Sequence, residues 1–239
     1  MQDKHNVALV TGASRGLGFA LARALGARGV RLALVARDLA GLRDAQQRLQ
    51  REQIDAEVFA ADIADKHAIY SLVAQVQAAL GPVDLLIHNA STLGHVPLRP
   101  LLDTDCEVLE QTLVTNVVGP FRLSKALAPG MLLRGAGTIV HISSDAAVNA
   151  YPSWGAYGTS KAALDHLARH LAVELAGSGV QVLSIDPGEM DTAMHRDAVP
   201  DADPTTLARP ETVAARIVAL LEARASAQRV AIPELEASA

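Results

Sequence analysis

The chain has 239 residues, of which half are apolar and a fifth are charged, which is enough for one large domain with a well-buried core. Its formal net charge of −5 argues against a nucleic acid or an anionic membrane surface as a partner. The single cysteine, Cys106, excludes an internal disulfide. The polar start, Met1 to Asn6, is too short for a signal peptide, and no apolar stretch reaches the roughly 18–20 residues of a membrane helix. We therefore expect a soluble, cytoplasmic protein.

Short apolar runs alternate with longer amphipathic segments along the chain. Strands are expected at Val7–Val10, Leu32–Val35, Ala56–Ala60, Leu85–His88, Thr138–Ile142 and Val180–Ile185. Helices are expected at Gly18–Arg28, Asp38–Arg51, Ala64–Leu80, Cys106–Leu133, Tyr157–Gly177 and Pro210–Arg224. This alternation predicts an α/β fold: a single Rossmann-type, doubly wound parallel sheet of about seven strands with helices on both faces. We find no linker and no internal repeat, so residues 1–239 are expected to form one domain.

The first strand runs into a glycine-rich turn, Thr11-Gly12-Ala13-Ser14-Arg15-Gly16-Leu17-Gly18. Its spacing is neither G-x-G-x-x-G nor a P-loop. A strand-to-helix turn of this kind nevertheless exposes unpaired N–H groups at the positive end of a helix, where a pyrophosphate can bind. We expect Gly12, Ser14, Arg15, Gly16, Leu17 and Gly18 to line a dinucleotide site; the alternative is a turn without a ligand.

This turn resembles the cofactor signature of the short-chain dehydrogenase/reductase (SDR) family, and later motifs agree in order and spacing from about Val7 to Val218. The resemblance implies a nicotinamide cofactor. The second strand ends in Ala36 and Arg37, where NAD-dependent relatives carry an acid at the position of Ala36. A guanidinium binds a 2′-phosphate, so Arg37 and Arg15 favour NADP(H) over NAD(H). The alternative is that Arg37 pairs with Asp38, which could instead cap the next helix.

Two further segments carry cofactor roles by resemblance. Asp62 and Ile63 correspond to the adenine contact of the family, although Asp62 could equally cap a helix that begins at Ala64. Asn89 and Ala90 correspond to the segment that stiffens the central sheet beside the cofactor ribose. The chain departs from the family pattern Asn-Asn-Ala-Gly at His88 and Ser91. We expect His88 to be a buried structural residue.

The clearest catalytic signal is Tyr157-Gly-Thr-Ser-Lys161, which places a phenol and an amine on one face of a helix. A nearby ammonium favours the phenolate form, so Lys161 is expected to lower the pKa of Tyr157 toward neutrality. By resemblance, Lys161 also holds the nicotinamide ribose, and Ser144, thirteen residues before Tyr157, polarises the substrate carbonyl. The resemblance makes Asn116 the residue that positions a water in a proton relay. The alternative is a packed Tyr157 and a surface Lys161.

The sixth strand leads into Asp186-Pro-Gly-Glu-Met-Asp-Thr192, which resembles the family's Pro-Gly-x-x-x-Thr stretch. The implied contacts with the carboxamide fall on Pro187, Gly188, Met190 and Thr192. The following segment, about 188–209, has no clear periodicity and is expected to form a substrate loop or a solvated surface loop. Candidates to line the substrate pocket are Leu93, His95, Asn149, Tyr151, Trp154, Met190, Met194 and His195.

These residues together predict an enzyme that transfers a hydride between NADP(H) and a small, mainly apolar carbonyl or alcohol substrate, acting as a carbonyl reductase and using no metal. An NADP-binding regulatory protein without turnover is the alternative. In the family, the helices corresponding to Cys106–Leu133 and Tyr157–Gly177 pack against their copies, which implies a homodimer, with a homotetramer as the alternative. Small residues would allow that approach: Ala162, Ala163, Ala168, Ala172 and Ala176.

Overall fold

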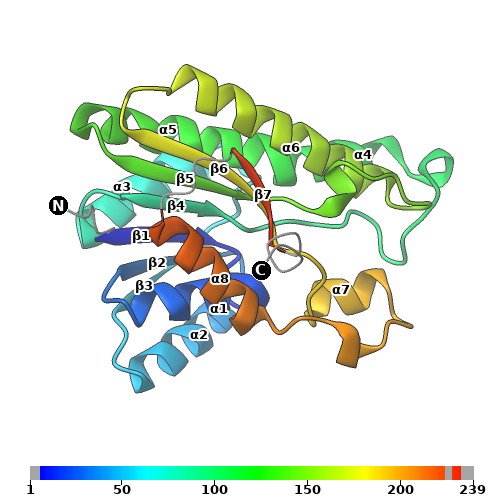
Figure 1. Ribbon diagram of the computed structural model, residues 1–239, viewed down its shortest axis with the longest axis horizontal. Helices are drawn as coiled ribbons and strands as arrows, with labels where there is room; N and C mark the ends of the chain where they lie inside the picture. Colours follow the sequence, from blue (N-terminus) through cyan, green and yellow to red (C-terminus); the bar gives the residue numbers. More distant parts are fainter. Residues whose placement is uncertain (1–5, 224–227, 233–239) are drawn as a thin grey trace.

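The computed structural model describes residues 6–223 and 228–232, which form a three-layer α/β fold around one parallel sheet (Figure 1). The strand order is β3-β2-β1-β4-β5-β6-β7, and every neighbouring pair is parallel. The strands are β1 (Val7–Thr11), β2 (Arg31–Ala36), β3 (Ala56–Ala60), β4 (Leu85–His88), β5 (Gly137–Ile142), β6 (Val180–Asp186) and β7 (Arg229–Ala231). The expected doubly wound sheet is confirmed.

Helices cover both faces of the sheet. One face packs against α1 (Gly16–Gly26), α2 (Leu39–Arg51) and α8 (Pro210–Glu222). The other packs against α3 (Ala68–Leu80), α5 (Gly119–Arg134) and α6 (Gly155–Glu174), with α4 (Cys106–Leu113) beside α6. Ala168, one of the alanines expected at a dimer surface, instead lies in this second core and is 2% exposed. That expectation was wrong because Ala168 is on the side of α6 that faces the sheet.

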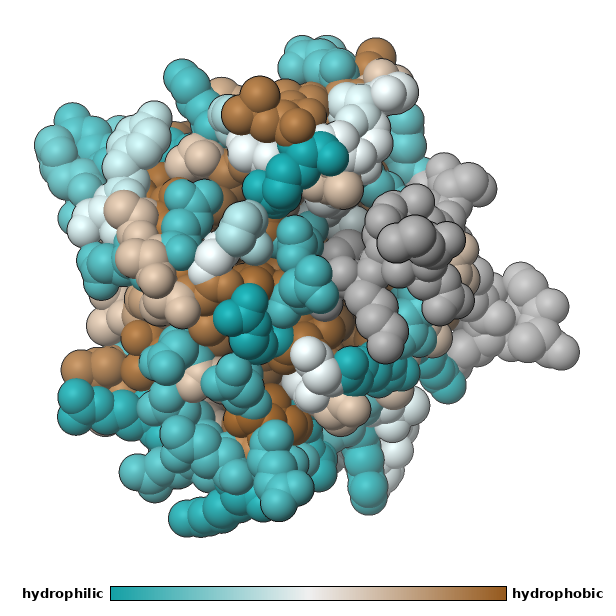
Figure 2. All heavy atoms as spheres, turned by 90° about the vertical axis from the view of Figure 1, so that its left-hand side faces the viewer, coloured by the Kyte–Doolittle hydropathy of each residue, from teal (hydrophilic) through white to brown (hydrophobic). Residues whose placement is uncertain are grey.

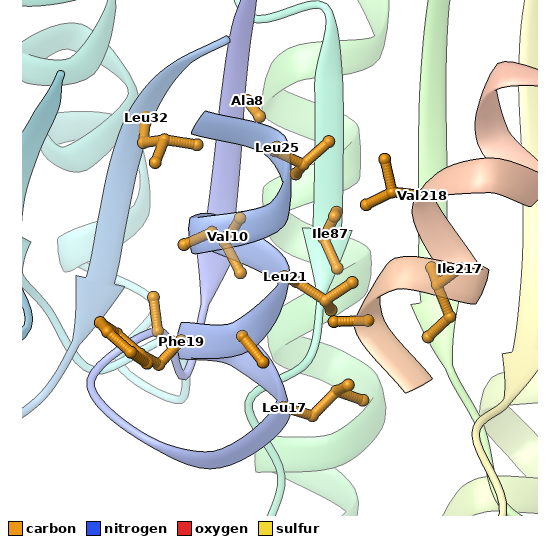
Figure 3. Packing of buried hydrophobic residues seen from close by; sticks show 14 of the residues in the cluster. Ala8, Val10, Leu17, Phe19, Leu21, Leu25, Leu32, Ile87, Ile217 and Val218 are labelled. Carbon is orange, nitrogen blue, oxygen red and sulfur yellow. The ribbon is translucent and has the colours of Figure 1, made fainter. Parts of the chain in front are cut away.

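Alternating side chains of each strand feed the two cores. In β1, Ala8 and Val10 pack under α1, whereas Leu9 faces the opposite helices. Figure 3 shows Leu21 of α1 over β1 and β4, with Ile217 and Val218 of α8 beside it in the same buried hydrophobic cluster. Burying a large aliphatic side chain contributes about 1.5–3 kcal/mol. This packing fixes the strand ends that carry the site.

Three helices begin two or more residues away from the expected position. Helix α1 begins at Gly16 rather than Gly18. Helix α3 begins at Ala68 rather than Ala64, because Asp62 and Asp65 accept hydrogen bonds from nearby N–H groups and form turns first. Helix α6 runs over Gly155–Glu174 rather than 157–177, and the Arg224 end of the last expected helix lies outside the described residues.

The expected helix over 106–133 is interrupted by a π-helical turn, Val114–Val118, between α4 and α5. Asn116 lies in this turn, and its amide bonds to the backbone of Thr92 on a neighbouring loop. A wide turn that turns a polar side chain toward a partner outside the helix is typical of functional positions. Periodicity could not predict the break, because the apolar pattern continues through it.

The expected loop 188–209 contains regular structure. Helix α7 (Ala193–Ala198) is capped by Thr192, a short helical turn follows at Pro204–Thr206, and Met190 bridges to Ala208. This segment lies at the right of Figure 1, beyond the carboxyl ends of the strands.

The opposite side, seen in Figure 2, shows brown hydrophobic side chains interrupted by teal hydrophilic ones.

No helix in the described ranges is both long and apolar enough to cross a membrane. Residues 6–223 and 228–232 also contain no group of three or more acidic, His or Cys side chains that could hold a metal ion.

Candidate active site

The carboxyl ends of β1, β4, β5 and β6 are neighbours in the sheet, so the segments that follow them meet at one edge. These segments carry the glycine turn, Asn89, Ser144 and the Asp186 loop, in that order across the sheet. The topology therefore brings the motifs of the sequence together.

The glycine turn is held closed by Asn89. The side-chain amide of Asn89 donates to the carbonyl oxygens of Thr11 at 2.9 Å and Gly12 at 3.2 Å. Gly12 has a φ of +67°, a conformation that side-chain-bearing residues rarely adopt. A Cβ on Gly18 would lie 2.3 Å from the Gly12 carbonyl oxygen. Only glycine therefore fits at Gly18, and Asn89 stiffens this part of the sheet.

The start of α1 suits a pyrophosphate. Arg15 is its N-cap residue, and no side chain of residues 6–223 and 228–232 caps the helix. The first N–H groups of α1 therefore lack side-chain acceptors, at the positive end of the helix dipole. A Cβ on Gly16 would come within 3.6 Å of Thr192, so the loop after β6 lies against this turn. Ser14, half-buried, and Leu17, buried, belong to the same turn.

Arg15 and Arg37 are exposed at this end of the sheet, and neither side chain forms an ion pair or hydrogen bond within residues 6–223 and 228–232. Asp38 does not pair with Arg37. Its carboxylate instead caps α2, accepting from the N–H groups of Ala40 at 3.0 Å and Gly41 at 3.1 Å. The two guanidinium groups thus stay available to an anion.

The Asp62 side chain, which follows β3, also hydrogen-bonds to a residue close to it in the sequence. Asp62 accepts from the N–H of Ala64 at 2.9 Å, and Ile63 is buried. Asp62 therefore caps a turn rather than a helix. Ala90 follows β4, and its N–H donates to the Thr11 hydroxyl at 3.1 Å.

Tyr157 and Lys161 share the inner side of α6. Tyr157 is 8% exposed and Lys161 is 2% exposed. The Lys161 ammonium lies 5.5 Å from the centre of the Tyr157 ring and donates to the carbonyl oxygen of Ile142 at 2.7 Å. Ser144, at the end of β5, forms a side-chain hydrogen bond with Tyr157. The expected phenol, amine and serine hydroxyl are therefore in one place.

The electrostatics of Tyr157 differ from the sequence-based expectation. Burial raises the pKa of Tyr157, the carboxylates Asp186 and Asp145 raise it further, and the hydrogen bond with Ser144 opposes them. In the chain taken alone the pKa of Tyr157 is therefore raised and does not move toward neutrality as expected, because burial outweighs the groups that favour the phenolate. Burial also lowers the pKa of Lys161 to about 8, against the attraction of Asp165 and Asp186.

The Asn116 side chain joins the loop that carries Thr92 to α6 through hydrogen bonds. Its Oδ1 accepts from the N–H of Thr92 at 2.8 Å, and its Nδ2 donates to the Thr92 carbonyl at 2.8 Å and to the Ser160 hydroxyl at 2.9 Å. The Ser160 hydroxyl donates to the carbonyl oxygen of Tyr157 at 2.7 Å. Asn116 thus fixes the backbone that carries Tyr157.

Several of the substrate-pocket candidates surround Tyr157. Leu93, Ala146 and Tyr157 form one apolar cluster, against which Trp154 and Met194 pack. The rings of Trp154 and Tyr157 meet edge to face at 5.7 Å. The polar candidates contact residues outside this apolar cluster. His95 contacts the Pro97 carbonyl, and His195 lies 3.6 Å from Glu189. The Tyr151 hydroxyl and the Asn149 N–H both donate to Asp145.

The residues expected to hold the carboxamide follow β6. Pro187 is buried, and the N–H of Gly188 donates to Asp186 at 3.0 Å. Thr192 accepts from the N–H of His195 at 3.2 Å, so its hydroxyl serves as the cap of α7. Met190 lies on the bridge to Ala208.

A buried polar row beneath the site was not foreseen. His88, as expected, is a buried structural residue: it contacts Ser124 at 2.8 Å and stacks on His141 at 4.7 Å. Asp165, one helical turn after Lys161, accepts from Ser184 and from Arg229 at 3.0 Å. The spacing of Asp165 from Lys161 could have indicated it, whereas nothing around Arg229 in the sequence does.

Comparison with known proteins agrees with this geometry. A family model described as short chain dehydrogenase matches residues 6–203. The 2-(R)-hydroxypropyl-CoM dehydrogenase of Xanthobacter autotrophicus is 36% identical over 189 residues, which cover 79% of this chain and 76% of that protein. Actinorhodin polyketide ketoreductase, solved with NADPH, has a TM-score of 0.87 and 30% identity, with 97% of each chain covered. NAD⁺-bound xylitol dehydrogenase has a TM-score of 0.85 and 25% identity, covering 96% of this chain and 98% of that one. The chain therefore belongs to the short-chain dehydrogenase/reductase family of oxidoreductases.

Proposed function

We propose that this chain is an NADPH-preferring carbonyl reductase that reduces small, mainly apolar ketones. The observation that carries the proposal is the meeting of Ser144, Tyr157 and Lys161 beside an uncapped helix end with two unpaired arginines. The apolar cluster around Tyr157, with Leu93 and Trp154, favours an apolar substrate.

The chain's own residues account for the proton. When bound, the nicotinamide supplies the hydride that reduces the carbonyl carbon. Tyr157 donates its phenolic proton to the carbonyl oxygen, which becomes the alcohol. The raised pKa of Tyr157 keeps it protonated before transfer, and the Lys161 ammonium stabilises the phenolate left behind. Ser144 hydrogen-bonds to the oxygen, and Asn116 supports the relay that returns a proton.

Removing the proton donor tests the enzyme against the regulatory alternative. In Tyr157→Phe, turnover of a ketone panel should fall by about 10²–10⁴-fold, whereas NADPH binding, followed by fluorescence, should change little. Unchanged turnover would refute the role of Tyr157. Tight NADPH binding by the wild type without reduction of any ketone would favour the non-enzymatic regulator.

The 2′-phosphate preference depends on Arg37 and Arg15. Arg37→Ala should raise the KM for NADPH by about tenfold, the loss of one charge-assisted hydrogen bond, and leave the KM for NADH unchanged. Arg31→Ala is the matched control, because Arg31 is exposed at the other end of the same strand. Equal effects of Arg37→Ala on both cofactors would contradict the preference.

We also propose a homodimer formed through α4, α5 and α6. Supporting it, α5 and α6 expose Phe121, Leu133 and Val173. Light scattering should give twice the chain mass; a monomer would refute the proposal, and four times the mass would indicate a tetramer.

A further inference from the structure

The residue after the catalytic serine is a carboxylate held in a fixed position. Asp145 begins a short helical turn, Asp145–Ala147, in which its carbonyl oxygen accepts from the N–H groups of Val148 and Asn149, each at 2.9 Å. The Tyr151 hydroxyl donates to its Oδ2 at 2.6 Å. Both backbone and side chain of Asp145 are therefore fixed beside the site.

Asp145 accepts a hydrogen bond from the same hydroxyl proton that Ser144 would offer to a substrate. The Ser144 hydroxyl donates to Oδ1 of Asp145 at 3.1 Å and accepts from the N–H of Ala146 at 3.2 Å. A serine hydroxyl has only one proton to donate. A substrate carbonyl must therefore compete with the Asp145 carboxylate for that proton.

The charges around this carboxylate offer little to an anionic substrate. Arg229, which donates to the carbonyl oxygen of Ser144, already pairs with Asp186 at 3.3 Å and Asp165 at 3.0 Å, and Arg196 of α7 binds Asp191. An anion close to Ser144 would meet the Asp145 carboxylate while both of these arginines are already paired; the Lys161 ammonium of the site donates to the carbonyl oxygen of Ile142.

We propose that Asp145 selects the substrate, favouring a ketone that carries a hydroxyl on the neighbouring carbon and disfavouring one that carries an anionic group there. A neighbouring hydroxyl can donate a hydrogen bond to Asp145 in place of Ser144, which leaves the Ser144 hydroxyl free to donate to the carbonyl oxygen. An anionic group meets the carboxylate as a like charge. This inference rests on the proposed reductase function.

Three ketones of one skeleton separate these effects: acetophenone, 2-hydroxyacetophenone and benzoylformate. The wild type should reduce 2-hydroxyacetophenone with a kcat/KM about tenfold above that of acetophenone, the size of one hydrogen bond to a charged group. Benzoylformate should have the lowest kcat/KM of the three.

Two substitutions separate the effect of the negative charge of Asp145 from the effect of its hydrogen-bond acceptor. Asp145→Asn keeps an acceptor and should raise the kcat/KM of benzoylformate relative to acetophenone by about tenfold. Asp145→Ala removes both and should also abolish the advantage of the hydroxyketone. Glu57→Gln, at the far edge of the sheet on β3, loses the same charge and should change neither ratio.

The pH profile gives an independent readout. Tyr157 faces Lys161, Asp186 and Asp145, and the Asp145 charge raises the pKa of Tyr157. Asp145→Asn should therefore move the alkaline limb of the reduction profile to lower pH. Circular dichroism and NADPH binding establish that each variant is folded.

The outcomes are distinguishable. If the wild type reduces none of the three ketones with NADPH, the proposed function fails, and this inference falls with it. If it reduces acetophenone but the ratios are equal in wild type and both Asp145 variants, the selecting role of Asp145 is refuted while the reductase function stands.

Discussion

The two faces of the central sheet are built on different principles. The face under α1, α2 and α8 is a continuous apolar core, to which α1 contributes Leu21 and α8 contributes Ile217 (Figure 3). The face under α3, α5 and α6 is apolar at the amino ends of the strands. Nearer their carboxyl ends it carries a polar row in register: His88 of β4, His141 of β5, Ser184 of β6 and Arg229 of β7.

The difference follows from what each face must position. The apolar face only has to hold α1 against the sheet, and aliphatic packing does this without directional bonds. The polar row lies under Lys161 and Ser144, and its hydrogen bonds are directional. Arg229 donates to the carbonyl oxygen of Ser144 at 3.3 Å, to Asp186 at 3.3 Å and to Asp165 at 3.0 Å. It thereby ties the catalytic strand end to α6 and β6.

Breaking the polar row at Arg229 should have the largest effect on stability. Arg229→Met leaves Asp165 and Asp186 unpaired, and their side chains are 6% and 7% exposed. We expect the free energy of unfolding to fall by about 3–5 kcal/mol, measured by urea denaturation. Arg23→Met, which removes an exposed pair with Glu52, should cost less than about 1 kcal/mol. Similar losses in both variants would show that burial does not matter here.

A cavity in the apolar face should have a somewhat smaller effect. Leu21 is fully buried, and Leu21→Ala should lower the free energy of unfolding by about 3 kcal/mol. Because Ser144 follows β5 and Tyr157 and Lys161 lie on α6, across the sheet from Leu21, kcat at saturating NADPH and low temperature should stay within about twofold of the wild type. A large loss of activity in a folded Leu21→Ala protein would show that the two faces are coupled.

The smallest effect at neutral pH is expected at His141. Neither of its ring nitrogens has a hydrogen-bond partner within residues 6–223 and 228–232, so His141→Leu should change the free energy of unfolding by less than about 1 kcal/mol.

At acid pH the same variant should differ from the wild type. Burial lowers the pKa of His141 to about 4, with Lys161 lowering it further and Asp165 raising it, and burial also lowers the pKa of His88. The unfolded chain takes up protons below about pH 6.5 that the folded chain refuses. Wild-type stability should therefore be complete above that pH and fall between pH 6.5 and 4, and His141→Leu should lose part of this dependence. An unchanged slope would contradict burial as its cause.

The sequence by itself determined the ranges of the first six strands, the doubly wound sheet and the residues that follow its carboxyl edge. These follow from short-range properties: apolar runs bounded by turn residues, glycines at a strand-to-helix turn, and a tyrosine and lysine one helical turn apart. The places of Gly12, Asn89, Ser144, Tyr157 and Lys161 needed no knowledge of distant contacts.

Only the tertiary structure decided how these groups are supported and charged. The break in the helix at Asn116 depends on Thr92, a residue 24 positions away. The pairing of Arg229 with Asp165 joins residues 64 positions apart, and the raised pKa of Tyr157 arises from burial. Burial and long-range hydrogen bonds depend on which segments the fold brings together, and periodicity along the chain does not contain that information.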